Sequence, residues 1–170
     1  MDNTKGKTID ELKVGQSACF TKTVSEADVY NYIGVSGDFN PAHINEEFAK
    51  KTRFKERIAH GMISAGFISS VLGTQLPGPG TIYLNQDLKF THPVHFGDTI
   101  TATCTVEELF PDTNRVILST VCENQHGKTV IEGRALVLAP LPDWNFNNNE
   151  ATLYEGRFFI FKKLFYWIEK

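Results

Sequence analysis

The pattern of apolar and polar residues changes its period along the chain. Residues 17–24, SACFTKTV, have the composition of a strand. In the segment that follows, SEADVYNYIGVSG, Ser25 occupies a helix-cap position, Asp28 stands at capping-box spacing, and Val29 and Ile33 repeat at helical spacing. This region therefore predicts one strand followed by an amphipathic helix.

Two further helices are predicted before the pattern changes. NEEFAKKT forms a short one, with Asn45 as its cap and two acidic residues in its first turn. Residues 60–76, HGMISAGFISSVLGTQL, form a longer one that PGPG at 77–80 ends. Because its apolar residues cover every face, we expect this helix to be buried. These residues are Met62, Ile63, Phe67, Ile68, Val71, Leu72 and Leu76.

Beyond the long helix the period becomes two, which is typical of strands. In the first such strand we expect Ile82, Leu84, Leu88 and Phe90 on one face, and Tyr83, Asn85, Asp87 and Lys89 on the other.

The remaining strands complete a sheet. A strand follows at 100–106, and RVILSTVCEN and TVIEGRALVLA form a hairpin joined by QHGK. One buried helix and about five antiparallel strands predict an α+β fold, with the sheet wrapped around the helix. Open sheet edges favour a dimer.

Composition and charge narrow the class of protein. The 170 residues carry a net charge of −3 with a pI near 5.9, so a nucleic-acid partner is not expected. The three dispersed cysteines, Cys19, Cys104 and Cys122, favour a reducing cytosol over a disulfide framework. The N-terminal residues lack the apolar region of a signal peptide, and no apolar run has the length of a membrane span. We therefore expect a cytoplasmic protein.

The C-terminal part differs from the rest in composition. Residues 1–139 are predicted to form one domain, 140–150 a linker, and 151–170 an aromatic and basic extension. The extension packs on its own dimer, docks on a partner protein, or lies on a membrane surface with Lys162 and Lys163 at the headgroups. We favour the first, because aromatic content alone is not a membrane anchor.

A candidate acid–base pair lies in SGDFNPAHINEEFA, residues 36–49. Asn40-Pro41 disfavours helix at Asn40, so Asp38 and His43 are expected on a bend rather than on one helix. Such a bend directs a carboxylate and an imidazole into one cleft, where they hold and deprotonate a water. The alternative is an aspartate that caps the next turn and a histidine that packs locally.

A second candidate element is Gly61 in IAHGM, at the start of the long helix. Backbone N–H groups in a first helical turn have no internal partner and carry partial positive charge, which stabilises a carbonyl oxygen that gains negative charge. Glycine also lets a ligand approach the backbone closely. The alternative is that Gly61 only permits tight packing of the helix on the sheet.

These segments together resemble a known family. SGDFNPAHINEEFA, IAHGMISAGFISSVLG, LPGPGTIYLNQDLKF and PVHFGDTI, in this order over residues 10–139, are similar to the MaoC-like (R)-specific enoyl-CoA hydratases. The resemblance implies a hot-dog fold, a homodimer, and reversible hydration of trans-2-enoyl-CoA to (R)-3-hydroxyacyl-CoA. It implies no metal or redox cofactor, since CoA is part of the substrate, and it leaves the pathway open between fatty-acid oxidation and supply of polyester precursors.

The resemblance also assigns roles to residues. It places the water-activating pair on Asp38 and His43, the thioester-binding N–H on Gly61, and a supporting helix serine on Ser69. Water would add its oxygen to C3 and its proton to C2 from the same side. We interpret His60 as structural, bonding the backbone near the helix start.

Several other residues have weaker signals. Arg53, Lys55 and Arg57 are candidates for the CoA phosphates, although solvated surface charge is the ordinary reading. Leu72 is a candidate for the acyl pocket, with core packing as the default. His92 and His95 have H-x-x-H spacing, but a metal would need further ligands, so no metal is expected.

Two other classes of function compete. Hot-dog thioesterases and hydroxyacyl-ACP dehydratases commonly carry a catalytic carboxylate on the central helix, and residues 61–80 contain none. A non-catalytic acyl-CoA-binding module would have no need of the base that Asp38 and His43 supply.

Overall fold

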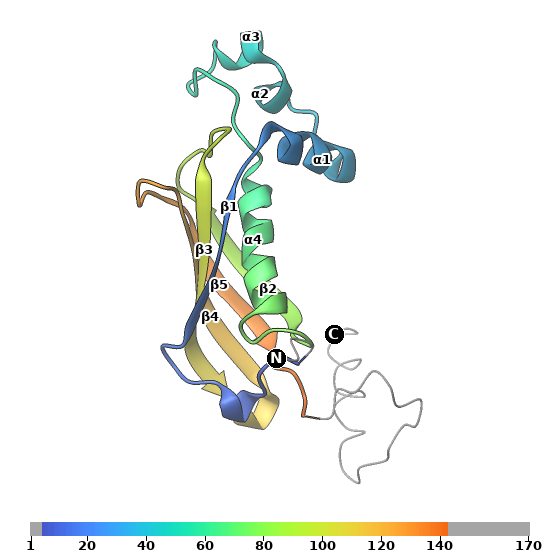
Figure 1. Cartoon of the computed structure of the whole chain (residues 1–170), viewed down its shortest axis with the longest axis vertical. Helices are drawn as coiled ribbons and strands as arrows, with labels where there is room; N and C mark the ends of the chain where they lie inside the picture. The colour runs from blue at the N-terminus through green and yellow to red at the C-terminus, as the bar shows by residue number, and fades with distance from the viewer. Residues whose placement is uncertain (1–4, 143–170) are drawn as a thin grey trace.

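Five antiparallel strands and one long helix form the body of the molecule in the computed structural model, which describes residues 5–142 (Figure 1). The strands pair in the order β1-β3-β4-β5-β2. The α+β arrangement expected from the sequence is confirmed. The bounds are β1 Ser17–Thr23, β2 Ile82–Phe90, β3 Thr99–Phe110, β4 Arg115–Glu123 and β5 Thr129–Leu138, with short 3-10 turns at Ile9–Glu11 and Pro111–Thr113.

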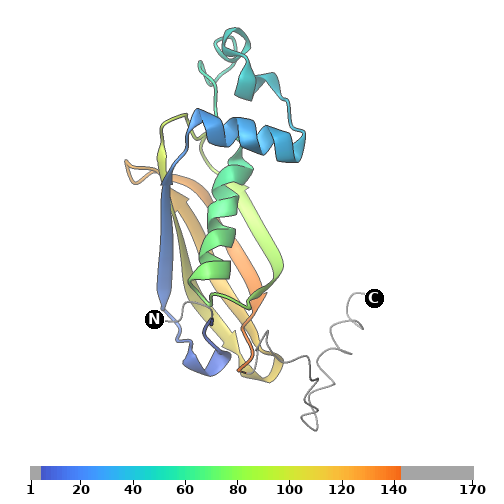
Figure 2. The same cartoon turned by 45° about the vertical axis from the view of Figure 1, so that its right-hand side comes forward.

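Helix α4, Gly61–Thr74, lies along one face of the curved sheet (Figures 1 and 2). Its sheet-facing residues are buried, and Ile68 and Val71 are fully enclosed. The expectation that the helix is buried on every side is wrong at Met62, which is 49% exposed. The sheet covers only one side of the helix in a single chain, and the other side exposes Met62, Gly66, Ser69 and Gly73.

Alternation is regular in the central strands and broken in β2. Every second residue is buried from Ile100 to Val106 in β3 and from Val116 to Cys122 in β4. In β2 the register shifts at Leu84, because Tyr83 pairs with Val137 and Asn85 with Leu136. This extra residue reverses the faces N-terminal to it. Our expected alternation, with Leu84 on the apolar face and Tyr83 on the polar one, is therefore lost here: Leu84 is 39% and Tyr83 40% exposed, although partial burial still raises the pKa of Tyr83 to about 12.

Three short helices extend beyond the N-terminal end of α4: α1 Glu26–Ser36, α2 Pro41–Ile44 and α3 Glu46–Ala49 (Figures 1 and 2). The predicted capping box between Ser25 and Asp28 is present, and Asn45 caps α3 as expected. Helix α3 is shorter than predicted, because the chain turns after Ala49. These helices bring their loops over the open end of α4.

The remaining sequence predictions concern the cysteines, membrane-spanning segments and the C-terminal part of the chain. All three cysteines are thiols, and burial raises the pKa of both Cys104 and Cys122 to about 12. Within residues 5–142, no helix is long and apolar enough to span a bilayer. The predicted extension at 151–170, and all but the first three residues of the 140–150 linker, lie outside the described residues.

Candidate active site

His43 is fixed by a one-turn helix and by one hydrogen bond. Asn40 caps α2 by accepting from the Ala42 N–H at 3.1 Å, and Pro41 begins the turn that carries His43 inward to 8% exposure. Its Nδ1 lies 2.7 Å from the carbonyl oxygen of Ile58. Because a carbonyl only accepts, Nδ1 carries the hydrogen, and the neutral ring has its lone pair on Nε2. His43 is thereby held in the tautomer of a general base.

The two carboxylate oxygens of Asp38 have different surroundings, and one of them supports the capping alternative. One carboxylate oxygen, Oδ1, accepts from the backbone N–H of Asn40 at 3.1 Å, which is local turn capping. The other, Oδ2, lies 3.7 Å from Nε2 of His60 at the start of α4. The side chain is 52% exposed, so its second oxygen remains accessible to a water.

His60 ties the Asp38 segment to α4 and supports His43. Its Nε2 donates to the backbone carbonyl of Asp38 at 3.1 Å, so the expected backbone bond exists, but to Asp38 rather than near the helix start. Its ring stacks on that of His43, with centroids 3.7 Å apart and 31° between the planes. Burial lowers the pKa of His60, and the neighbouring His43 lowers it further against the opposing effect of Asp38. His60 is therefore neutral near pH 7, and its contact with the Asp38 carboxylate is no ion pair.

The three side chains are close enough to share a water. One polar atom from each of Asp38, His43 and His60 lies within 4.8 Å of the others. Two hydrogen bonds of about 2.8 Å each to one oxygen span such a distance. A metal ion fits less well, because Nδ1 of His43 and Nε2 of His60 already donate to backbone carbonyls, which leaves at most one lone pair on each ring. That no metal is used stays a prediction.

Gly61 is the first residue of α4, and its position has a packing reason as well as a chemical one. A Cβ there would lie 2.6 Å from Cε1 of Phe90. The packing alternative is therefore supported. The N–H groups of a first helical turn also have no partner within the helix, so they are available to a ligand. The thioester-binding role of Gly61 stays a prediction.

A pocket of about 230 Å³ lies beside His43 and Gly61, while Asp38 and His60 are not among the residues that line it. Its polar lining includes His43 of α2, Gly61 and Ser64 of α4, and Arg53 of the loop between α3 and α4. Its apolar wall comes from Phe54, Phe90, Val130 and Ile131. An imidazole, a helix N-terminus and an apolar channel therefore meet in one cavity.

The other predicted site residues are placed less directly. Ser69 is on the exposed side of α4 and does not line this pocket, while Leu72 is 1% exposed within the core. Arg53 lines the pocket, with its guanidinium 4.9 Å from the Phe54 ring centroid. Lys55 is exposed nearby, at a positive φ of 67°. The roles given to these four residues stay predictions.

Arg57 has partners that the sequence did not suggest. Its guanidinium contacts Glu26 of α1 at 2.7 Å and Glu46 of α3 at 3.3 Å, and it lies 4.7 Å from the Phe96 ring centroid. The Glu26 hydrogen bond raises its pKa. Arg57 thus joins the short helices to each other, and its predicted contact with CoA phosphates would compete with both carboxylates.

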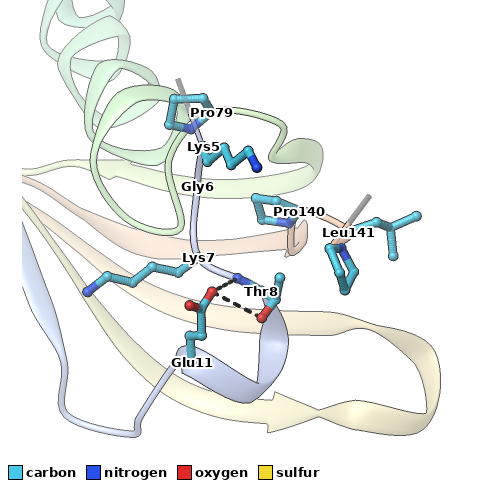
Figure 3. A pocket seen from close by; sticks show the side chains of 9 residues that line it. Lys5, Gly6, Lys7, Thr8, Glu11, Pro79, Pro140 and Leu141 are labelled. Carbon is cyan, nitrogen blue, oxygen red and sulfur yellow. Dashed lines mark hydrogen bonds between the residues drawn. The ribbon is translucent and has the colours of Figure 1, made fainter. Parts of the chain in front are cut away.

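A larger hollow lies at the opposite end of the molecule (Figure 3). It measures about 510 Å³ and is lined by Lys5, Lys7, Glu11, Pro79 and Pro140, among others. Glu11 is occupied there by hydrogen bonds from the backbone and hydroxyl of Thr8, at 2.8 and 3.1 Å. Since no histidine lines it, whereas His43 lines the smaller pocket, the smaller pocket is the better candidate active site.

Sequence reasoning missed Ser64. It lines the pocket and is 1% exposed, and its Oγ has no hydrogen-bond partner within the described part of the chain. The available signal was its spacing, since residues three apart on a helix share a face and Ser64 follows Gly61 by three.

Comparison with known proteins places the chain in a family. Residues 11–128 match the MaoC-like domain. An (R)-specific enoyl-CoA hydratase from Rhodospirillum rubrum is 58% identical over 131 residues, which are 77% of this chain and 90% of that protein. A 3-hydroxybutyryl-CoA dehydratase from Methylorubrum extorquens is 43% identical over 131 residues, 77% of this chain and 83% of the relative.

Solved structures agree. The unliganded R-hydratase PhaJ1 from Pseudomonas aeruginosa superposes with a TM-score of 0.76 at 47% identity, covering 79% of this chain and 86% of that one. The chain belongs to the MaoC-like domain family and has the hot-dog fold, as the sequence resemblance implied.

Proposed function

We propose that the protein is a hydro-lyase that adds water to trans-2-enoyl-CoA to give (R)-3-hydroxyacyl-CoA, and that it catalyses the reverse dehydration. The observation that carries the proposal is the His43 tautomer: the Ile58 carbonyl holds the hydrogen on Nδ1 and leaves a basic Nε2 beside the Asp38 carboxylate. The names of the relatives from R. rubrum and M. extorquens support both directions.

In the proposed mechanism, Asp38 and His43 hold one water next to C3 of the substrate. The pair accepts a proton as the water oxygen bonds to C3, and the electron pair of the double bond moves toward the thioester carbonyl. The N–H of Gly61 stabilises the resulting enolate-like oxygen. The proton is then delivered to C2 on the same side, which restores the carbonyl and the resting state of the pair.

The direct test uses crotonyl-CoA and follows loss of the enoyl thioester absorbance. The proposal expects rapid loss with purified protein, retention of activity in EDTA, and a product of R configuration at C3. Release of free CoA instead would identify a thioesterase. Activity on an enoyl-acyl carrier protein alone would identify the hydroxyacyl-ACP dehydratase, and tight binding without turnover would identify a binding module.

We further propose a cytoplasmic homodimer. Support comes from the open edges of the sheet at β1 and β2 and from large apolar residues exposed in the single chain. Phe39 beside Asp38 is 66% exposed, and Met62 and Phe90 beside Gly61 are 49% and 50% exposed. A second copy that covers these residues would also seclude the pocket from water. Light scattering that finds an active monomer at assay concentration would contradict the dimer.

A further inference from the structure

Ser64 lies in the candidate active site with an unpaired hydroxyl. Its side chain is 1% exposed, lines the pocket shared by His43 and Gly61, and makes no hydrogen bond to any described residue. Buried polar atoms in folded proteins almost always have a partner, so an exception needs an explanation. For a hydroxyl that lines a pocket, a bound ligand can supply the missing hydrogen-bond partner.

Other buried polar atoms without a hydrogen bond are accounted for differently. Those of Arg57, His95 and Glu107 contact oppositely charged or ionisable groups at 3.3, 3.0 and 2.8 Å, which leaves His60 Nδ1 and Ser64 Oγ in the described part of the chain. His60 does not line the pocket, whereas Ser64 does. Ser64 is therefore the orphaned group that faces the cavity.

The local fold does not use this hydroxyl. A serine early in a helix often bonds a carbonyl one turn back, and Ser64 makes no such bond, while the His60 carbonyl accepts from the Ile63 N–H at 3.0 Å. The carbonyl of Ser64 accepts from the Cys122 thiol at 3.5 Å, which positions this turn of α4 against β4. The backbone is thus anchored while the side chain has no structural task.

We infer that the Ser64 hydroxyl donates a hydrogen bond to the thioester carbonyl oxygen, as a second donor beside the N–H of Gly61. This rests on the proposed hydration of enoyl-CoA. Residues three apart on a helix lie about 5–6 Å from each other on the same face. One oxygen placed between the two can accept from the N–H of the first turn and from the hydroxyl of the next.

A second donor matters because charge develops on that oxygen during reaction. As the water oxygen bonds to C3, the carbonyl oxygen gains negative charge, and it returns this charge when C2 takes its proton. Two donors placed at this oxygen stabilise the charged intermediate more than the neutral ground state. Ser64 therefore acts on kcat more than on KM.

The test compares Ser64→Ala with Ser64→Thr, which keeps the hydroxyl, and with Ser70→Ala on the same helix outside the pocket. With crotonyl-CoA, Ser64→Ala lowers kcat about tenfold to a hundredfold with KM within about threefold, because one oxyanion donor is lost. Ser64→Thr keeps most of the rate and Ser70→Ala matches wild type.

A spectroscopic readout separates polarisation from packing. Hexadienoyl-CoA absorbs further to the red when its carbonyl is polarised, and an Asp38→Asn background slows its turnover enough for the spectrum of the bound probe to be recorded at early times. Adding Ser64→Ala to that background reduces the red shift of the bound probe, and adding Ser70→Ala does not. An unchanged red shift, a Ser64→Ala kcat within about twofold of wild type, or equal losses in Ser64→Ala and Ser64→Thr would each overturn the inference. A wild-type protein that leaves crotonyl-CoA unchanged would instead refute the proposed function.

Discussion

The two ends of helix α4 differ in the residues that surround them. Toward the C-terminal end, Ile68, Val71 and Leu72 are at most 1% exposed and pack in one continuous apolar core. At the N-terminal end, the helix meets two stacked imidazoles, an aspartate and an orphaned hydroxyl. The C-terminal end is fully packed against apolar side chains. The N-terminal end includes polar atoms that have no hydrogen-bond partner in the described part of the chain.

This difference shows how stability and chemistry are divided in the protein. Burial of large apolar side chains contributes about 1.5–3 kcal/mol each and fixes the axis of α4 against the sheet. Desolvation of His60 and an unpaired Ser64 hydroxyl oppose folding to a smaller extent. The stability that the buried C-terminal half of α4 provides thus compensates for the unpaired polar groups at its N-terminal end.

The largest effect is expected from the acid–base pair. Asp38→Asn and His43→Gln each lower the rate of crotonyl-CoA hydration by about two to four orders of magnitude, because each removes a group that activates the water. Asp38→Asn leaves thermal unfolding nearly unchanged, since its exposed amide keeps an oxygen for capping. A folded variant of either kind with near-wild-type kcat would show that this end of α4 does not activate water.

The core end predicts the converse result. Ile68→Ala lowers the free energy of unfolding by about 2–5 kcal/mol, because it opens a cavity where the side chain is fully buried. Ile68→Val, the matched control, costs about 0.5–1.5 kcal/mol. Urea titrations measure both, and kcat at a temperature where each variant is folded stays close to wild type. A loss of kcat without loss of stability would remove the division between the two ends.

The sequence predicted the core end better than the active end. The apolar composition of residues 60–76 and the period of two in β3 and β4 both reflect burial within one chain, which local patterns record. The error at Leu84 came from a bulge, which shifts the register without a local signal. The exposure of Met62 reflects how much of α4 one sheet can cover.

The active end depends on contacts between distant segments. Asp38, His43 and Gly61 were expected from their motifs, but the stacking of His43 on His60 and the Ile58 carbonyl that fixes the tautomer are tertiary contacts. Ser64 is one of several small residues of α4, and only its burial in the pocket distinguishes it. Spacing alone does not say which serine faces the cavity.

Of the two arginines near the active end, Arg53 is expected to bind the substrate and Arg57 to stabilise the fold. Arg53 lines the pocket, so Arg53→Ala raises KM for acyl-CoA several-fold while stability stays unchanged. Arg57→Ala instead lowers the free energy of unfolding by about 1 kcal/mol, because its partners Glu26 and Glu46 are about half exposed and solvent screens them. Steady-state kinetics and urea titrations of both variants check this, and exchanged outcomes would contradict it.

The smallest effect concerns the cap of α1, which supports the active end from outside. The Lys22 hydrogen bond, with those from Ser25, lowers the pKa of Asp28 from 3.8 to about 2. Because the pKa of this carboxylate is lower in the folded state, it stabilises the fold at pH values above its pKa in the unfolded state. This contribution is lost as the pH falls toward its pKa in the folded state. Asp28→Asn therefore costs about 1 kcal/mol at neutral pH. The difference from wild type shrinks between about pH 4 and pH 2, and a constant difference would contradict the assignment.

The proposed mechanism requires one water held between Asp38 and His43 on a single face of the substrate. Hydration of crotonyl-CoA in D2O, followed by NMR of the isolated 3-hydroxybutyryl-CoA, tests this most directly. We expect R configuration at C3 and one deuterium at C2, added on the same side as the new hydroxyl. Anti addition, or a mixture of the two C2 diastereomers at early conversion, would contradict it.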